Sequence, residues 1–374
     1  MSDRPQFTSG REDGRFVDTA GFIHASLKAL RPALCFDPEI PAEQFPHWRE
    51  RVRDRLAELL RFPEVPPQPE PRMLWGEPRA GYELQKWECF PEPRSVVPFL
   101  VLIPEGVPRP APAVLCFPGS SRTKEGLAGE PEESDDRHWA RNAMAQRYAR
   151  EGIVAIAADN PGVGELRSEV QPNRAVHPMN LLWLGRNFEG LTTWQKLPML
   201  EWARSQPWID PGRIAVSGHS LGAKPALNLM VLDEGIRALV FNDFTCDFRE
   251  RAVAMNLELI ALHQYIPDFS LWFDSPELVA ACAPRRVLIT EGGRTVHIER
   301  IQRAWELLGV SDNVEVHYYP RFTDPADRLH EGEPMPEGLS MEEYYEYANI
   351  DVVNHAFKHE VAVPWLARVL CAGT

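Results

Sequence analysis

The stretch Ile214-Ala215-Val216-Ser217-Gly218-His219-Ser220-Leu221-Gly222-Ala223 decides the fold of this chain. It places the pattern G-x-S-x-G between an apolar run and a helical stretch that extends from Leu221 to Leu232. A serine in that context is expected on a tight turn between a strand and a helix, where neighbouring glycines relieve the crowding of the backbone. The turn would lift Ser220 above the sheet and direct the helix N-terminus towards the reacting group. We therefore predict that Ser220 is a nucleophile.

Working outward from this turn, short strand-like runs alternate with helical stretches. The runs cover residues 82–90, 96–103, 113–117, 153–158, 213–216, 238–241, 286–290 and 314–319. Helices are expected near 48–60, 137–150, 192–206, 221–232, 297–308 and 351–370. Alternation of this kind, with apolar strands, predicts an α/β fold in which helices cover both faces of a mostly parallel central sheet.

Two parts of the chain differ in composition. Residues 1–80 are expected to form an N-terminal arm and a helix that pack on the core, with a proline-rich, extended linker at 63–71. Residues 81–374 are expected to form the catalytic domain. Segments near 246–276 and 321–349 do not fit the alternation and are predicted to be cap-like insertions over one end of the sheet, where such folds place their active sites.

The charge balance limits the classes of partner. The chain has 374 residues, of which 40 are basic and 54 acidic, so the formal net charge is −14. Binding to nucleic acid or to anionic lipid needs a basic face, and an acidic chain disfavours both. No apolar run approaches the ~18–20 residues that span a bilayer. We expect neither a nucleic-acid nor a membrane partner.

The cysteines do not indicate a cofactor site. All six stand alone, without a C-x-x-C pair, so neither a zinc site nor a redox pair is predicted. His355 and His359 have the spacing of a zinc pair, but no ligand or base lies between them, and we expect no metal. The polar N-terminus lacks the apolar core of a secretory signal, which leads us to expect a cytoplasmic protein.

Four motifs along the chain point to one family. They are Ala113–Gly119, Ala158–Glu165 with the pattern D-x-P-G-x-G-E, Trp208–Ile214 and the serine turn. Together they resemble the α/β-hydrolase superfamily, and more closely its dienelactone-hydrolase and acetyl-xylan-esterase-like branch. The resemblance covers residues 82–370. It implies the α/β-hydrolase fold and a chain order of serine, then acid, then histidine.

Under this resemblance the general base follows the last strand of the sheet. Three histidines lie there: His330, His355 and His359. His355 is favoured because it precedes a terminal helical segment, as the base does in the family. His330 is the alternative, and His359 is most simply an exposed helix residue.

The resemblance places the acid after the preceding strand, where this chain offers Glu291 in place of the aspartate usual in the family. Asp243 is the alternative, because some members of the superfamily carry their acid one strand earlier. Its simpler interpretation is a turn residue that accepts hydrogen bonds from backbone N–H groups.

Acyl transfer also needs two fixed N–H donors for the developing oxyanion. One is expected from Leu221, the residue after the nucleophile, and the other from Ser120 in the loop after the 113–117 strand. Pro118 has no N–H and cannot serve. The histidine of the family's H-G-x-G motif is missing from this loop.

Lys224 lies four residues after Ser220, at an offset where glucuronoyl esterases carry a lysine that recognises sugar. This one-residue match makes Lys224 a candidate substrate-binding residue, although an ion-paired helix residue is the simpler interpretation.

These residues predict a serine-dependent hydrolase that cleaves a carboxylic ester through an acyl-enzyme. The expected substrate is a small-molecule or oligosaccharide ester. A carbohydrate esterase acting on acetyl or glucuronoyl esters is the main alternative, and a peptidase-like hydrolase or a catalytically silent binding protein are the others. The sequence leaves the oligomeric state open.

Overall fold

The strands of the computed structural model form one sheet, and the structure describes residues 6–120, 122–131, 143–258 and 261–371. Within these residues the strands lie in the order β1-β2-β3-β5-β4-β6-β7-β8-β9. Their bounds are β1 Arg72–Arg79, β2 Tyr82–Glu92, β3 Ser95–Pro104, β4 Ala111–Phe117, β5 Val154–Ala158, β6 Ile209–His219, β7 Ala238–Asn242, β8 Arg286–Ile289 and β9 Val314–Val316.

The sheet changes direction along its width. From β1 to β5 neighbouring strands pair antiparallel, and from β5 through β4 to β9 every pair is parallel. The parallel strands β4, β5 and β7 are buried along their whole length, as expected for strands covered on both faces. The predicted mostly parallel α/β-hydrolase sheet is therefore confirmed. The edge strand β1 was not predicted, because it is exposed and shows no alternation of apolar residues.

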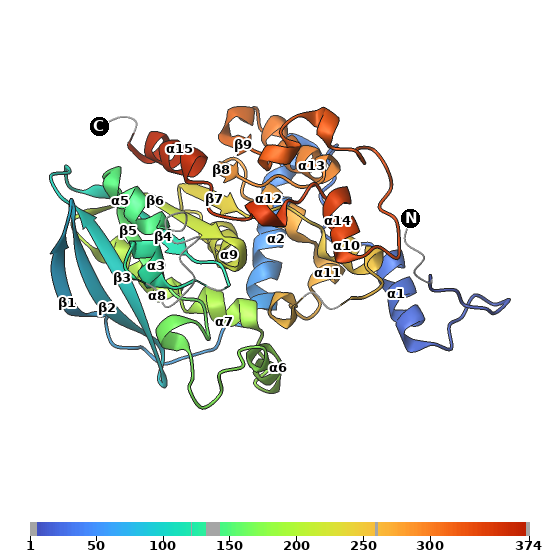
Figure 1. The fold of residues 1–374 in the computed structure, drawn as a ribbon, viewed down its shortest axis with the longest axis horizontal. Helices are drawn as coiled ribbons and strands as arrows, with labels where there is room; N and C mark the ends of the chain where they lie inside the picture. The colour runs from blue at the N-terminus through green and yellow to red at the C-terminus, as the bar shows by residue number, and fades with distance from the viewer. Residues whose placement is uncertain (1–5, 121, 132–142, 259–260, 372–374) are drawn as a thin grey trace.

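Helices cover both faces of the sheet, as Figure 1 shows. The main helices are α1 Thr19–Ala29, α2 Phe45–Leu60, α3 Lys124–Ala128, α5 Met144–Arg150, α6 Val176–Trp183, α7 Phe188–Trp194, α8 Leu197–Ser205, α9 Ala223–Leu232, α10 Phe248–Ala254, α11 Phe269–Trp272, α12 Ser275–Ala280, α13 Thr295–Leu307, α14 Met341–Tyr347 and α15 His359–Cys371. One apolar cluster packs α2, α8, α9, α12 and α13 on one face. A second packs α3, α5 and α15 on the other.

Two helix predictions were wrong. The helix expected at 192–206 is two helices, α7 and α8, because Pro198 begins a new first turn and cannot continue the preceding one. The helix expected at 351–370 begins only at His359. The segment before it is tied to the end of β7, since Asn242 accepts a hydrogen bond from Lys358 N at 2.7 Å. The first residues of the helix expected at 137–150 lie outside the described residues.

The N-terminal residues contribute helices to both the core and the insertions. Trp48, Val52 and Leu56 of α2 are buried in the main core, as the helical spacing predicts. The helix α1 was not predicted, and it packs against α10. Residues 63–71 form no helix or strand, in agreement with the predicted linker. The division into an arm and a catalytic domain at residue 80 stays a prediction.

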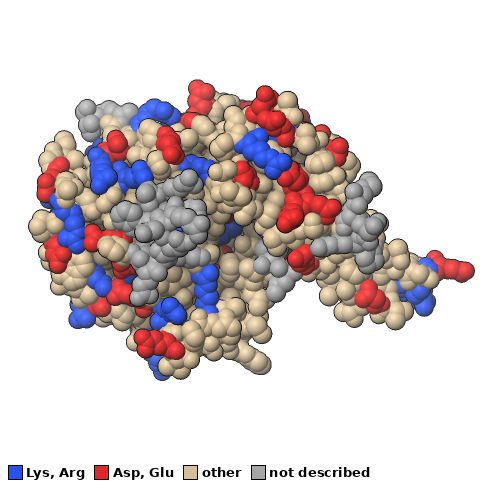
Figure 2. Space-filling view, viewed as in Figure 1, with Lys and Arg blue, Asp and Glu red and all other residues tan. Residues whose placement is uncertain are grey.

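The two insertions pack against each other. Ala254 and Met255 from the first share an apolar cluster with Tyr344 and Ala348 from the second. Figure 1 shows α10, α11 and α14 gathered on one side, next to α1. Figure 2 shows acidic and basic side chains interspersed over the face in view. Among the described residues no helix is long and apolar enough to span a membrane.

Candidate active site

The serine turn has the strained geometry that its sequence predicts. β6 ends at His219, and the chain turns through Ser220 into a short 3₁₀ segment before α9. Ser220 has φ 53°, in the left-handed region that non-glycine residues rarely adopt. A Cβ at Gly218 would lie 2.1 Å from the Gly222 carbonyl oxygen, and one at Gly222 would lie 2.3 Å from the Phe117 oxygen. Both positions therefore require glycine.

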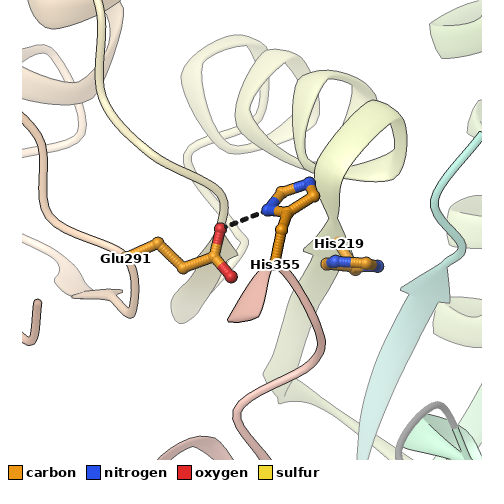
Figure 3. Close-up of side chains that lie close together, drawn as sticks. All are labelled: His219, Glu291 and His355. Atoms are coloured by element: carbon orange, nitrogen blue, oxygen red, sulfur yellow. Dashed lines mark hydrogen bonds and ion pairs between the residues drawn. The ribbon is translucent and has the colours of Figure 1, made fainter. Parts of the chain in front are cut away.

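Glu291 and His355 meet although 64 residues separate them. Glu291 follows β8 and is fully buried, and His355 lies in the loop before α15. The distance from His355 Nδ1 to Glu291 Oε2 is 2.6 Å, and Figure 3 shows this hydrogen bond as a dashed line. The carboxylate therefore orients the imidazole and leaves Nε2 on the opposite side of the ring.

Two further side chains hold the carboxylate. The Tyr319 hydroxyl donates to Glu291 Oε2 at 2.8 Å and lies 3.3 Å from His355 Nδ1. The Lys358 ammonium donates to Glu291 Oε1. Each oxygen of the buried carboxylate thus has a donor, which offsets the cost of removing a charge from water.

The electrostatics of the pair favour charge on both groups. Burial alone would raise the pKa of Glu291, but the hydrogen bond from His355 and the Lys358 charge hold it below its ordinary value. Burial alone would lower the pKa of His355, but the Glu291 hydrogen bond and charge hold it above its ordinary value. The carboxylate stays ionised, and the imidazole gains affinity for a proton. A general base needs this combination.

The alternative acid lies elsewhere. Asp243 follows β7 and accepts a hydrogen bond from the Phe244 N–H at 3.0 Å, so it is the turn residue that its sequence also allowed. Its other oxygen lies 3.8 Å from Lys224 Nζ. Burial raises the pKa of Asp243. Of the two acids, Glu291 is the one in hydrogen-bond contact with His355.

The alternative bases also lie elsewhere. His330 stacks on the Tyr347 ring with centroids 3.7 Å apart and bonds to Glu333. His359 pairs with Glu360 at 3.0 Å. Of the three candidate histidines, only His355 contacts Glu291.

A cavity of about 180 Å³ lies over the serine turn, and we call it the serine cavity. Its lining includes Ser120, Ser220, Leu221, Lys224 and Asp243. The structure thus brings both predicted oxyanion donors and the predicted substrate-binding lysine to the predicted nucleophile.

The loop that carries Ser120 is held by hydrogen bonds to other segments of the chain. A Cβ at Gly119 would lie 3.5 Å from Ser220 Cβ, so the loop touches the serine turn. Asn160 Nδ2 donates to the Pro118 oxygen at 2.7 Å, and Arg174 donates to the Ser120 oxygen. Asp159 accepts from the Lys124 N–H at 2.7 Å. The D-x-P-G-x-G-E motif therefore anchors both ends of this loop.

Three residues of the site were missed from the sequence: His219, Tyr319 and Lys358. His219 is buried beside His355, with ring centroids 4.8 Å apart, and neither ring nitrogen has a hydrogen-bond partner among the described residues. Burial lowers the pKa of His219 to about 3, so its ring is neutral. Its place inside G-x-S-x-G was visible, but nothing in the pattern indicates contact with the base.

His219, Glu291 and His355 form the one group of possible metal ligands within the described part of the chain, with ligand atoms within 4.8 Å of one another. The 2.6 Å contact between Glu291 and His355 is a hydrogen-bond distance. Two ligands of a tetrahedral ion, each about 2.0–2.2 Å from it, lie farther apart than this. The geometry fits a hydrogen-bonded pair better than a metal site.

The fold and the serine turn define an α/β-hydrolase. The Abhydrolase family model matches residues 2–368, and this chain belongs to that family.

Two relatives differ greatly in how much of the chain they match. A crystal structure from Bacteroides fragilis NCTC 9343, described as a "putative acetyl xylan esterase", is 38% identical, with a TM-score of 0.91. That match covers 97% of this chain and 98% of the other. "Putative hydrolase YtaP" of Bacillus subtilis (strain 168) is 25% identical over 134 residues, which are 36% of this chain and 44% of that relative.

A glucuronoyl esterase from Solibacter usitatus shares the fold alone. It is 15% identical, with a TM-score of 0.58, over 85% of this chain and 96% of its own.

Proposed function

We propose that this chain is a serine-dependent esterase in which Ser220 is the nucleophile, His355 the general base and Glu291 the acid that orients it. The observation that carries the proposal is the 2.6 Å contact between His355 and the fully buried Glu291, in a chain whose serine turn has the geometry of a nucleophile elbow. The chain order of serine, acid and histidine agrees with the family.

The reaction follows from these groups. His355 Nε2 takes the hydroxyl proton as Ser220 Oγ forms a bond to the ester carbonyl carbon. The N–H groups of Leu221 and Ser120 stabilise the oxyanion of the tetrahedral intermediate. The intermediate collapses, the C–O bond to the alcohol breaks, and His355 returns the proton to the departing alcohol. Water then attacks the acyl-enzyme by the same steps and releases the acid.

The reaction requires one further contact of His355. His355 makes its hydrogen bonds through Nδ1, and the reaction requires Nε2 to approach Ser220 Oγ. Hydrogen bonds of this kind are often long in free enzymes and tighten when substrate binds.

A carbohydrate ester is the substrate that we favour. The relative that is 38% identical over nearly the whole chain is described as a "putative acetyl xylan esterase". The serine cavity carries Lys224 next to Ser220, and a lysine there can donate hydrogen bonds to sugar oxygens. We propose that Lys224 binds substrate. A cytoplasmic location stays a prediction.

The test is turnover of a panel of p-nitrophenyl acetate, acetylated xylose and a methyl glucuronate. Wild-type protein and Ser220→Ala are compared, with Ser217→Ala as the matched control from the same strand. Ser217 is buried and bonds to Tyr148, away from the cavity. We expect turnover by the wild type and the control, and its loss by several orders of magnitude in Ser220→Ala. Equal activity in all three proteins would contradict the proposal.

A further inference from the structure

A buried carboxylate beside the serine cavity has no hydrogen-bond partner. Glu189 lies in the first turn of α7 and is 4% exposed. Neither of its oxygens accepts a hydrogen bond from any residue that the structure describes. Burial raises the pKa of Glu189 to about 8, although the Lys224 charge opposes the change. A buried polar group without a partner destabilises the folded state, so its presence calls for an explanation.

The unpaired carboxylate faces a second, smaller cavity. This cavity has a volume of about 30 Å³ and is lined by Glu189, Lys224, Phe248 and Gln264, among others. Lys224, Phe248 and Gln264 also line the serine cavity. Gln264 Oε1 is a second buried oxygen without a partner in the described residues. The two cavities are therefore neighbours, separated by side chains that they share.

The backbone around Glu189 packs closely against the neighbouring helices. A Cβ at Gly190 would lie 1.8 Å from the Leu60 carbonyl oxygen, so α7 packs directly on the end of α2. Asn187 caps α7 and also donates to the Leu59 oxygen at 2.8 Å. α7 in turn packs against α9, the helix that begins after Ser220. Glu189 is thus held at a set position relative to the nucleophile.

Lys224 lines both cavities and forms a long ion pair with Asp243. Its ammonium lies 3.8 Å from Asp243 Oδ2, beyond hydrogen-bond distance, and 4.5 Å from the centroid of the Phe248 ring. The side chain is 13% exposed. An ammonium has three donors, and the carboxyl group of Glu189 can accept through its carbonyl oxygen, so together they offer what a hydroxyl group needs.

We propose that Glu189, acting with Lys224, binds a hydroxyl group of the substrate close to the ester that Ser220 attacks. This inference rests on the proposed esterase function. The hydroxyl donates to Glu189 and accepts from Lys224. The site offers one acceptor and one donor to a hydroxyl group, which favours a neutral polyol such as a sugar ring with free hydroxyls.

The experiment compares three esters on four proteins. The esters are methyl β-xylopyranoside carrying one acetate, the same acetate with its remaining hydroxyls converted to methyl ethers, and p-nitrophenyl acetate. A methyl ether keeps an acceptor oxygen but cannot donate to a carboxylate. The proteins are wild type, Glu189→Leu, Glu189→Gln and Glu201→Gln. Glu201 is an exposed residue of the neighbouring α8 and is the matched control.

We expect wild type and Glu201→Gln to prefer the hydroxylated acetate over its methyl ether. Glu189→Leu should lose roughly 10- to 100-fold in kcat/KM on the hydroxylated acetate, mainly through KM, because the substrate hydroxyl loses its hydrogen-bond partner at a buried position. The value of kcat/KM for Glu189→Gln on this ester should lie between those of wild type and Glu189→Leu. On p-nitrophenyl acetate the kcat/KM values of all four proteins should agree within about twofold, because this ester has no hydroxyl to bind.

Thermal unfolding separates binding from a structural role. Leucine removes an unpaired buried carboxylate, so Glu189→Leu should unfold at the same or a higher temperature than wild type. A lower unfolding temperature with equal loss on all esters would overturn the inference, as would unchanged specificity in Glu189→Leu, since Glu189 would then serve only the fold or bind a water molecule. A folded wild type that hydrolyses none of the three esters would instead refute the proposed esterase function.

Discussion

The Tyr319 hydroxyl and the Glu291 carboxylate form a hydrogen bond of 2.8 Å through the same oxygen that His355 contacts. Tyr319 follows β9 and Glu291 follows β8, two neighbouring parallel strands. The carboxyl ends of these strands therefore position the acid, and the tyrosine competes with the imidazole for one oxygen. We expect the number of donors on this oxygen to affect how strongly Glu291 polarises the base.

Tyr319→Phe should test that competition. Without the hydroxyl, Glu291 Oε2 has one donor fewer, so its hydrogen bond to His355 should strengthen and the pKa of His355 should rise. We expect kcat to change less than about tenfold, because the triad itself is retained. The measurement is the pH profile of kcat/KM on p-nitrophenyl acetate. The pH at which kcat/KM rises should move up in Tyr319→Phe, and a move to lower pH would contradict the account.

Glu291→Gln and Asp243→Asn separate the two acids. If Glu291 orients His355, the glutamine keeps the shape but favours the wrong tautomer of the imidazole. The comparable change in a Ser-His-Asp protease costs about 10⁴-fold in kcat. Asp243→Asn should cost far less, because Asp243 contacts Lys224 and the Phe244 N–H rather than His355. Steady-state kcat on one activated ester decides, with circular dichroism as the folding control. The reverse ranking would move the acid to Asp243.

The pH dependence of activity should report the raised pKa of His355. The base must be neutral to accept a proton, so kcat/KM should rise with pH and level off above the pKa of His355, which lies above its ordinary value of 6.5. In Glu291→Gln the carboxylate that raises the pKa of His355 is lost, while the burial that lowers this pKa remains. The rise of kcat/KM with pH should therefore move to lower pH. If kcat/KM rises at the same pH in this variant as in wild type, a group other than His355 controls the pH dependence.

Asn160→Ala should impair the oxyanion loop. The variant removes the donor to the Pro118 oxygen, two residues before Ser120. A small displacement of an oxyanion donor can cost on the order of 10²-fold in rate. We expect a fall in kcat with little change in KM, measured on p-nitrophenyl acetate. Asn180→Ala, an exposed residue of α6 bonded to its own helix, is the control. Equal kinetics in the two variants would remove Asn160 from the positioning of this loop.

The stability of the free protein should depend on Glu189. Its folded pKa is raised to about 8 from an ordinary value of 4.5, so the folded state binds this proton more tightly than the unfolded state. The resulting stability is fully present below pH 4.5 and is lost as the pH rises through 8. Glu189→Gln should therefore reduce the fall in unfolding temperature between pH 5 and 8. An identical fall in both proteins would show that Glu189 does not carry this change.

Local patterns predicted the elements that bury apolar residues. Strands such as β5 and β7 and the helix α2 follow from short apolar runs or helical spacing, and the serine turn follows from its glycines. The exposed strand β1 gave no such signal. The helix start at His359 was missed because it depends on Asn242, more than a hundred residues earlier in the chain.

The candidate site was predictable only where a motif marks it. The family order nominated Glu291 and His355, and the structure brings them into contact. Tyr319 and Lys358 support Glu291 through contacts across 28 and 67 residues, which no local pattern reveals. Glu189 is similar, because its isolation depends on how α7 packs against α2 and α9.

The most direct test of the central claim is mass spectrometry of the protein after reaction with a fluorophosphonate. The account predicts one adduct, on the peptide that contains Ser220, because His355 activates that hydroxyl towards the phosphorus atom and fluoride leaves. Ser220→Ala should remain unmodified, and Ser217→Ala should be labelled like wild type. An adduct on another residue, or undiminished labelling of Ser220→Ala, would contradict the assignment of Ser220 as the nucleophile.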